Sequence, residues 1–327
     1  MTARRNPIDE SYRACRSLVR RSGSNFTGAF WMLPSRQRQG MYALYAFMRH
    51  TDDLVDQPAA GNDPAAALAQ WRGELAAALG DQHTLGDVGQ ASCQLPGERR
   101  SAPTSAAVSC AKPPSADERR NMSPGTVLLP AVADTLAQFR IPAKLLFEVI
   151  EGVEMDLHPR RFARFADLEQ YCDRVAGAVG LACIHIWGFR GPEAFEPARQ
   201  CGLAMQLTNI LRDLGEDLQQ GRLYLPEEDV AAFGCTAEDL FAGRRDDRTR
   251  RLIEFEAARA AGHFREAARL APLLSSPGRR IYKMLTGVYE ALLDKIARQP
   301  ADVFRRRLTV SRWRKLWIAT GLFFRTA

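Results

Sequence analysis

Apolar residues recur every three or four positions along most of the chain, which is the period of an amphipathic α-helix. In the stretch 8–21, for example, Tyr12, Cys15 and Val19 fall on one side and several arginines on the other. The same periodicity predicts helices over 8–21, 35–57, 63–80, 127–139, 142–155, 166–189, 193–219, 249–271 and 277–297. Alternating strand patterns and Asn-Gly hairpin turns are absent from the sequence. The pattern therefore predicts an all-α protein.

One long stretch, 81–125, does not follow this pattern. It is rich in Gly, Ser, Pro, Gln and Arg, and it has few large apolar residues. Such a composition predicts a polar, poorly ordered insertion, which we interpret as tolerated at the surface, with a functional lid as the alternative. The predicted organisation is a single domain over 8–320, interrupted by 81–125 and ending in a basic and apolar segment, 304–327.

Two of the predicted helices carry acidic faces. Asn209, Asp213 and Asp217 are spaced four positions apart, so they share one face of a helix whose other side is a leucine-rich stripe. Asp52 and Asp56 repeat this spacing on the helix over 35–57. Like charges one turn apart repel each other. A single acidic face is typical of a solvated surface, but two such faces suggest that both helices bind the same cation.

Facing carboxylates suit Mg²⁺, which prefers oxygen ligands and combines one or two carboxylates with substrate phosphates. Arg49, Arg212 and Arg222 lie near these acids and would complete a trap for a diphosphate. Metal ions neutralise a leaving diphosphate, so an allylic carbon would depart as a carbocation. The rest of the cavity must then be apolar and dry. Residues of the required kind are Phe26, Phe30, Tyr45, Tyr171, Tyr289 and the small residues over 175–180.

Two local patterns leave alternatives open. The small residues over 175–180 either allow two helices to approach closely or leave space for a ligand. The run S-G-S-N at 22–25 is either a cradle of backbone N–H groups for phosphate or a simple turn between helices with a cap.

Composition narrows the choice of partner only a little. The chain has 327 residues and a net charge of +7, which suits nucleic acid, an anionic membrane or a phosphorylated substrate. Its seven cysteines are scattered, and its five histidines show no metal spacing. Together with the lack of a signal peptide or a spanning apolar stretch, this predicts a cytoplasmic protein with reduced thiols.

The segment 304–327 is basic first and apolar afterwards. That order is typical of an amphipathic segment at an anionic lipid surface, and it predicts peripheral contact with the inner face of a membrane. The alternative is a C-terminal helix that docks on the core and leaves its arginines in solvent. The oligomeric state is not indicated by the sequence.

Taken in order, the motifs resemble those of the squalene and phytoene synthases, the enzymes that couple isoprenoids head to head. The resemblance covers about 20–320, except for the insertion. The motifs that carry it are S-G-S-N-F at 22–26, Y-A-L-Y-A-F-M-R-H-T-D-D-L-V-D at 42–56, Y-C-D-R-V-A-G-A-V-G at 171–180, the run 206–217 with N-x-x-x-D-x-x-E-D, G-R-L-Y-L-P at 221–226 and the basic run 303–316. The resemblance implies an isoprenoid-synthase helical bundle around a central cavity.

The resemblance also implies roles for individual residues. Mg²⁺, or Mn²⁺ in its place, would be held by Asp52, Asp56, Asn209, Asp213 and Asp217, with Glu216 as a weaker candidate. Tyr45 and Arg49 match diphosphate contacts, to which the chemistry above adds Ser22, Ser24, Arg212 and Arg222. The prenyl chains would lie against Phe26, Tyr171, Ala176, Val179, Gly180, Gln206 and Tyr289, with Phe30 added for its aromatic side chain. The expected catalytic residues are Asp52, Asp56, Asp213, Asp217 and Tyr171.

The implied reaction is a magnesium-dependent condensation of two prenyl diphosphates. We expect two farnesyl diphosphates to give presqualene diphosphate or squalene, because S-G-S replaces the S-K-S form of many members and the ending is rich in arginine. The alternative is a phytoene synthase that joins two geranylgeranyl diphosphates. NADPH would be needed only if the reaction ran to squalene.

Two other classes of protein compete with this interpretation. The run D-D-L-V-D at 52–56 is formally the motif of chain-elongating prenyltransferases and terpene cyclases, but the second motif, N-x-x-x-D-x-x-E-D, argues against elongation. A non-enzymatic basic protein that binds lipid or RNA would gather its basic residues and aromatics in one patch. Here the basic residues are spread along the chain, so we expect no nucleic-acid partner.

Overall fold

The computed structural model describes residues 6–22, 28–58, 61–80, 125–158, 161–311 and 318. All elements within these ranges are helices, apart from one isolated bridge between Phe189 and Leu274. The all-α prediction is therefore confirmed. Ser24, Phe26, the insertion except for Gly125, and most of 312–327 lie outside the described residues.

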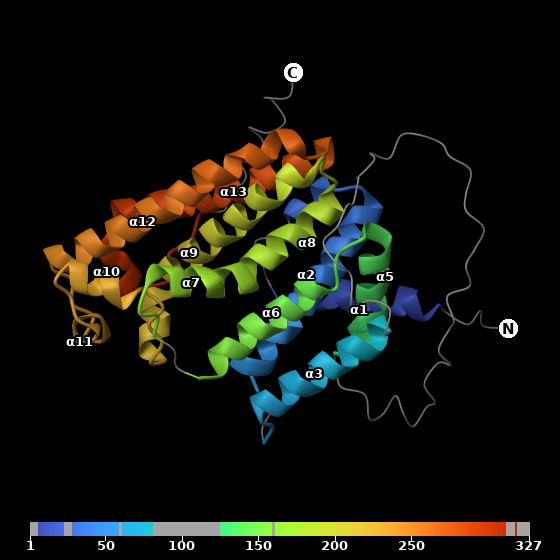
Figure 1. Ribbon diagram of the computed structural model, residues 1–327, viewed down its shortest axis with the longest axis horizontal. Helices are drawn as coiled ribbons and strands as arrows, with labels where there is room; N and C mark the ends of the chain where they lie inside the picture. The colour runs from blue at the N-terminus through green and yellow to red at the C-terminus, as the bar shows by residue number, and fades with distance from the viewer. Residues whose placement is uncertain are drawn as a thin grey trace.

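The first half of the chain forms one group of helices around a shared core (Figure 1). Its α-helices are α1 Pro7–Arg21, α2 Ser35–Asp56, α3 Pro64–Leu79, α5 Leu129–Phe139 and α6 Lys144–Glu154. Short 3₁₀ turns add η1 Ala29–Met32, η3 Thr126–Leu128 and η4 Met155–Leu157. The start of α3 shows why these helices begin where the pattern predicts, since Asp63 accepts hydrogen bonds from two backbone N–H groups of the first turn and Pro64 follows it.

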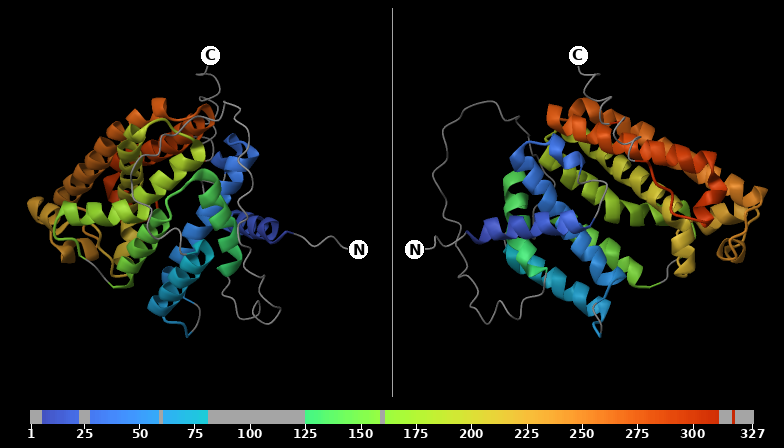
Figure 2. Two further views of the ribbon diagram at one scale, coloured as in Figure 1. Left: turned by 45° about the vertical axis from the view of Figure 1, so that its right-hand side comes forward. Right: turned by 180° about the vertical axis from the view of Figure 1, so that it is seen from behind.

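The second half of the chain packs beside the first, with α12 and α13 along the outer edge (Figure 2). Its longer helices are α7 Phe165–Cys172, α8 Ala178–Trp187, α9 Phe195–Gln219, α12 Asp247–Ala267 and α13 Ser276–Arg298. Two short helices, α10 Glu227–Ala232 and α11 Ala237–Phe241, were not expected from the periodicity. Other short helical turns are η6 Pro192–Ala194, η7 Ala268–Leu273 and η8 Pro300–Phe304.

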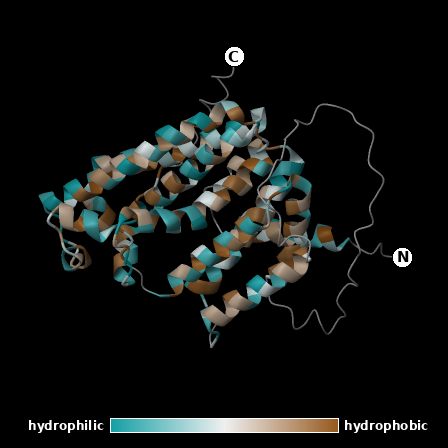
Figure 3. Cartoon of the chain, in the orientation of Figure 1, coloured by the Kyte–Doolittle hydropathy of each residue, from teal (hydrophilic) through white to brown (hydrophobic). Residues whose placement is uncertain are grey.

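Helix α9 carries the second acidic face. The apolar stripe of α9 is buried, as the spacing predicts, and consists of Leu207, Ile210, Leu211, Leu214 and Leu218. Figure 3 shows how brown apolar positions alternate with teal polar ones along the helices. Because the stripe is fixed in the core, Asn209, Asp213 and Asp217 are left on the opposite side of the helix.

The predicted helix over 166–189 is interrupted by a π-helical turn, Asp173–Gly177, between α7 and α8. This turn packs closely against α9, since a Cβ on Gly202 would lie 2.2 Å from the Ala176 carbonyl oxygen. Arg199 of α9 also forms an ion pair with Asp173, with 2.5 Å between nitrogen and oxygen. Apolar periodicity does not report such a local change of helix winding, which is why the sequence predicted one continuous helix.

Candidate active site

The acidic faces of α2 and α9 approach the same place. Arg222, in the turn after α9, donates from Nη1 to Asp56 Oδ1 of α2 at 3.3 Å. Burial raises the pKa of Asp217 on α9 and of Asp156 in η4, and the positive charge of Arg222 opposes the rise at both carboxylates. Residues far apart in the sequence therefore lie close together here, and their assignment to an active site stays a prediction.

Asp156 lies at the centre of this site, although the sequence did not single it out. The hydroxyl of Tyr171 donates to Asp156 Oδ2 at 2.9 Å, and the hydroxyl of Tyr224 donates to Asp156 Oδ1 at 3.0 Å. Burial raises the pKa of Asp156, while these two hydrogen bonds and Arg222 oppose the rise. Two features of the sequence could have pointed to this contact. Asp156 is a carboxylate close after the mainly apolar helix α6, and Tyr224 lies inside the G-R-L-Y-L-P motif.

An aromatic cluster forms the wall next to Asp156. The ring of Tyr171 lies 5.6 Å from that of Tyr224 and 5.6 Å from that of Phe162, measured between centroids. Burial first, and the charge of Asp156 second, raise the pKa of Tyr171 well above its usual value. Tyr171 therefore stays protonated and acts as a hydrogen-bond donor, with an aromatic face that can stabilise a cation.

Asp52 and Asp217 both have perturbed electrostatics. Burial and the neighbouring charge of Asp56 raise the pKa of Asp52 to about 7. Burial and the charge of Asp213 raise the pKa of Asp217 to about 7. The Asp52 side chain is still open to solvent, so protein surrounds it without sealing it off. Added positive charge would therefore stabilise both carboxylates.

Two arginines already neutralise Asp213. Arg212 donates from Nε to Asp213 Oδ1 at 2.7 Å, and Arg307 Nε lies 2.9 Å from the same oxygen. Arg307 Nη1 also lies 3.9 Å from Glu216 Oε2. Arg307 belongs to the basic run that the sequence assigned to a lipid surface, and within the described residues it faces the acidic motif of α9 instead.

Two further predicted site residues, Tyr289 of α13 and Asn209 of α9, lie next to each other. Buried Tyr289 hydrogen-bonds to Asn209 and Arg212, so it supports the acidic face, and burial raises its pKa. Asn209 donates from Nδ2 to Gln206 Oε1 at 3.3 Å, and its own Oδ1 is buried without a hydrogen-bond partner. On α2, Arg49 Nη2 pairs with Asp53 Oδ1 at 2.6 Å.

Several residues predicted for the prenyl pocket have clear packing contacts. Phe30 is buried and packs edge-on against Tyr42 and Tyr45, with ring centroids 5.8 and 6.4 Å apart. A Cβ on Gly180 would lie 2.4 Å from the Ala198 carbonyl oxygen of α9, so this glycine is needed for close helix approach. Val179 packs against the core of the first half.

The phosphate-binding prediction for the turn after α1 can be followed only at Ser22. Its hydroxyl donates to the Val19 carbonyl at 2.8 Å, and its backbone N–H donates to the Leu18 carbonyl at 3.0 Å. Ser22 therefore acts as a helix cap in this structure, and Ser24 lies outside the described residues.

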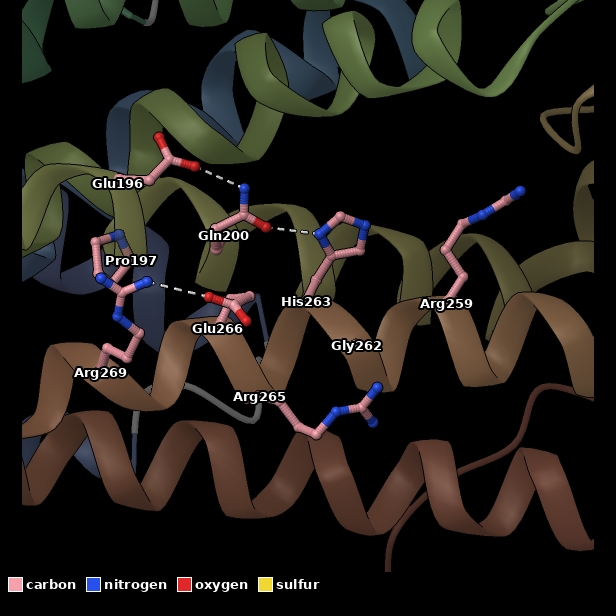
Figure 4. Close-up of a pocket in the computed structure, with 9 residues that line it drawn as sticks. All are labelled: Glu196, Pro197, Gln200, Arg259, Gly262, His263, Arg265, Glu266 and Arg269. Carbon is pink, nitrogen blue, oxygen red and sulfur yellow. Dashed lines mark hydrogen bonds and ion pairs between the residues drawn. The ribbon is translucent and has the colours of Figure 1, made fainter.

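A separate surface cavity of about 400 Å³ lies along the seam of α9 and α12 (Figure 4). Its wall includes Gln200, whose Oε1 lies 2.6 Å from His263 Nδ1. The charged residues on its rim are of both signs, and Glu266 pairs with Arg269 at 3.2 Å. The two acidic faces do not contribute to this cavity, which is lined by other residues.

Solved structures define the class of fold. The chain is similar to a dehydrosqualene synthase, with a TM-score of 0.76, 26% identity and 98% of each chain covered. It is also similar to a squalene synthase from Alicyclobacillus acidocaldarius, with a TM-score of 0.70, 27% identity, and 90% of this chain and 98% of the other covered. The architecture is that of the all-α isoprenoid synthases, which confirms the predicted fold.

Sequence relatives define the family. The sequence profile of the squalene/phytoene synthase family matches residues 19–314. The 15-cis-phytoene synthase of Synechococcus elongatus is 32% identical over 94% of this chain and 91% of its own length. The 15-cis-phytoene synthase of Synechocystis is 30% identical over 94% of this chain and 83% of its own. The chain belongs to the squalene/phytoene synthase family; it is a prenyltransferase that condenses prenyl diphosphates head to head.

Proposed function

We propose that this enzyme joins two geranylgeranyl diphosphates into phytoene with the help of Mg²⁺ or Mn²⁺. The observation that carries the site assignment is the meeting of two acidic faces, with Arg222 bonded to Asp56 of α2 and acting on Asp217 of α9. The relatives named phytoene synthase, at 29–32% identity over at least 94% of this chain, support the C20 substrate. They favour this alternative over the farnesyl substrate expected from the sequence.

The residues at the site fit a divalent cation. Asp52 and Asp217 have pKa values raised to about 7, so both gain from added positive charge. The buried Oδ1 of Asn209 has no hydrogen-bond partner, and amide oxygens are suitable ligands for Mg²⁺. Within the described ranges, no three His, Cys, Asp or Glu side chains are already gathered around one point. The proposed ligands are Asp52, Asp56, Asn209, Asp213 and Asp217, with Glu216 at the edge.

When bound, the metal would neutralise the diphosphate that leaves the first substrate as its C1–O bond breaks. Arg222 and Arg49, which stand beside the acids of α2, are the residues proposed to hold the diphosphate oxygens. The aromatic faces of Tyr171, Tyr224 and Phe162 would stabilise the allylic cation and exclude water.

The next steps form and rearrange carbon–carbon bonds between the two substrates. The double bond of the second substrate attacks the allylic cation, and loss of one proton closes a cyclopropane that still carries one diphosphate. Departure of that diphosphate, rearrangement and loss of a second proton give phytoene, with two diphosphates and two protons released in all. No reductant enters this sequence, so we propose that NADPH is not used.

The test is incubation of the purified enzyme with geranylgeranyl or farnesyl diphosphate and Mg²⁺, with and without NADPH, followed by mass analysis of the products. We expect the C20 substrate to give a C40 hydrocarbon with a conjugated triene at its centre, whether or not NADPH is present. The C15 substrate should be turned over more slowly. A C30 product formed preferentially from farnesyl diphosphate would restore the squalene alternative. Absence of product with EDTA and its return with Mg²⁺ or Mn²⁺ would support the metal assignment.

A further inference from the structure

The turn η8, which comes directly before the basic run, is fitted closely against the acidic motif of α9. A Cβ on Gly215 would lie 2.6 Å from the Val303 carbonyl oxygen, so the two backbones touch at a position where only glycine fits. Val303 and Leu308 are both buried on either side of the basic run. This contact fixes the position of the backbone near Arg307 relative to Asp213. The ion pair between the two side chains is therefore determined by the packing of the backbone.

Asp213 carries one negative charge but contacts two arginines. Its Oδ1 accepts from Arg212 Nε at 2.7 Å and lies 2.9 Å from Arg307 Nε, and its Oδ2 lies 3.4 Å from Arg307 Nη2. Arg307 also reaches Glu216 at 3.9 Å. Two guanidinium groups therefore cover the lone pairs that a metal ion would need on this carboxylate.

The two arginines differ in how readily they can leave. The side chain of Arg212 is 17% exposed and hydrogen-bonds to buried Tyr289. The side chain of Arg307 is 50% exposed and has its contacts at the rim of the site. A half-exposed ion pair contributes a modest but measurable net stability, because water solvates the arginine when the pair opens. Arg307 is the partner that a competing cation can displace.

We propose that Arg307 is the resident counter-cation of Asp213 in the metal-free enzyme, and that a divalent cation displaces it when the site is loaded. This inference rests on the proposed function, because it takes Asp213 as a metal ligand. Arg307 would keep the acidic motif neutralised between turnovers. Coupling between two cations for one carboxylate is reciprocal: loss of Arg307 must raise metal affinity, and metal must cancel the stability that Arg307 contributes.

The first measurement is direct Mn²⁺ binding without substrate, followed by electron paramagnetic resonance, in the wild type and in Arg307→Gln. We expect Arg307→Gln to bind Mn²⁺ about two- to fivefold more tightly, the factor that fits the loss of one partly exposed competitor. The matched control is Arg306→Gln, since Arg306 is the adjacent residue, is 66% exposed and pairs with Asp302 at 2.6 Å. It removes the same charge, and its affinity should equal that of the wild type.

The second measurement is thermal unfolding in EDTA and in saturating Mg²⁺. Arg307→Gln should have a lower Tm than the wild type in EDTA, and the difference should vanish in Mg²⁺, because Arg307 is then already displaced. Arg306→Gln should show the same difference in both conditions. Equal Mn²⁺ affinity in the two variants, binding detectable in neither, or a Tm loss in Arg307→Gln that metal does not change would overturn the proposal. Failure of the proposed function is separate, since it appears as wild-type enzyme that makes no C40 product.

Discussion

Asp52 lies on α2 and Asp213 on α9, and each carboxylate has different cationic neighbours, Arg49 for Asp52 and the pair Arg212 and Arg307 for Asp213. Replacement of either by alanine removes a proposed metal ligand, so the developing charge on the leaving diphosphate is no longer compensated. We expect turnover to fall at least about a thousandfold in Asp52→Ala and in Asp213→Ala. Neither side chain belongs to the apolar core, so the helical circular dichroism should be unchanged.

The matched control for these variants is Asp294→Ala. Asp294 lies on α13, is 63% exposed and forms only a long i,i+4 contact with Arg298, at 3.9 Å. It should retain wild-type product formation with geranylgeranyl diphosphate. If Asp52→Ala or Asp213→Ala coupled prenyl diphosphates at a near wild-type rate, the assignment of the acidic faces to the reaction would be wrong.

Asp217 offers a test through pH. Its pKa is raised to about 7 in the folded protein, above the usual value of an aspartate, so the folded state binds this proton more tightly than the unfolded state does. The favourable contribution of the protonated group is present at low pH and is lost as the pH rises through 7. Asp217→Asn resembles the protonated form, so it should raise the Tm of the metal-free protein at pH 8.

The same variant should raise the Tm by roughly half as much at pH 5.5, where folded wild-type protein still binds the proton but the unfolded chain has already lost it. Thermal unfolding in EDTA at both pH values measures the two differences. A gain of equal size at pH 5.5 and pH 8 would mean that the neighbouring carboxylates do not perturb Asp217. Comparison within a pair of proteins at each pH removes the contribution of other titrating groups, such as Glu256, which are common to both.

For individual residues, the sequence predicted site residues that recur at helical spacing within one helix. It missed site residues that come together only through the tertiary fold. The spacing of Asp213 and Asp217 needs only the helical period to be recognised. Asp156 and Arg307 each follow a helix and reach the site only because two separate backbones approach, at η4 and at Gly215. No local period records such an approach.

Among the elements, the contact between α9 and the π-helical turn has the tightest packing requirement. A Cβ on Gly202 would lie 2.2 Å from the Ala176 carbonyl oxygen and 2.8 Å from the Gly177 nitrogen, both backbone atoms. Gly202→Ala must therefore push the turn away from α9. We expect a loss of about 1–3 kcal/mol in the free energy of unfolding. Turnover should fall with it, because Tyr171 lies in the last turn of α7, two residues before the π-helical turn.

Urea denaturation of Gly202→Ala and of Gly73→Ala would measure this effect. Gly73 lies on the exposed face of α3, where nothing lies within 4 Å of a Cβ, so alanine there should stabilise by about 0.5–1 kcal/mol. The expected changes in the free energy of unfolding have opposite signs. The loss in Gly202→Ala measures packing, and the gain in Gly73→Ala measures helix propensity. A Gly202→Ala protein as stable as the wild type would show that the helices can separate without cost.

The elements also show where periodicity stops being informative. Amphipathic patterns predicted each long helix to within a few residues, because one buried face decides whether a helix forms. They did not predict α10 and α11, which are too short for a period, or the π-helical turn inside 166–189. The small residues over 175–180 were ambiguous for a related reason. Within the described ranges, Gly180 faces a backbone oxygen that leaves no room for a Cβ, whereas Gly177 faces only the carboxylate of Asp173.

At the scale of the whole molecule, two apolar clusters are joined through α9. One contains the helices of the first half together with α8 and the adjoining ends of α9, α12 and α13, and the other contains the rest of the second half. Met205 packs against both. In the described part of the chain, no helix is long and apolar enough to cross a membrane. Contact of 304–327 with a membrane surface stays a prediction, since most of that segment lies outside the described residues.

The two ends of the insertion lie close to each other. Thr126 donates from Oγ1 to Glu74 Oε2 of α3 at 2.8 Å, so the chain returns to the helix that it left after Leu79. Glu74 is only about 8 Å back from Leu79 along the helix axis. Deletion of 85–122 would leave 81–84 and 123–125 as a linker, which can extend to about 25 Å. The fold can therefore close without the deleted residues.

We expect the protein without 85–122 to keep wild-type thermal stability to within a few degrees and most of its coupling activity. The acids and aromatics of the site are held by α2, η4, α7, α9 and the turn after α9, and the contacts given above do not involve the insertion. Product formation from geranylgeranyl diphosphate and the Tm of the deletion protein measure both expectations. A folded deletion protein that has lost all activity would instead assign the insertion a part in the reaction, as a lid over the site. Retained activity would mean that the helices on either side of the insertion supply the whole catalytic apparatus.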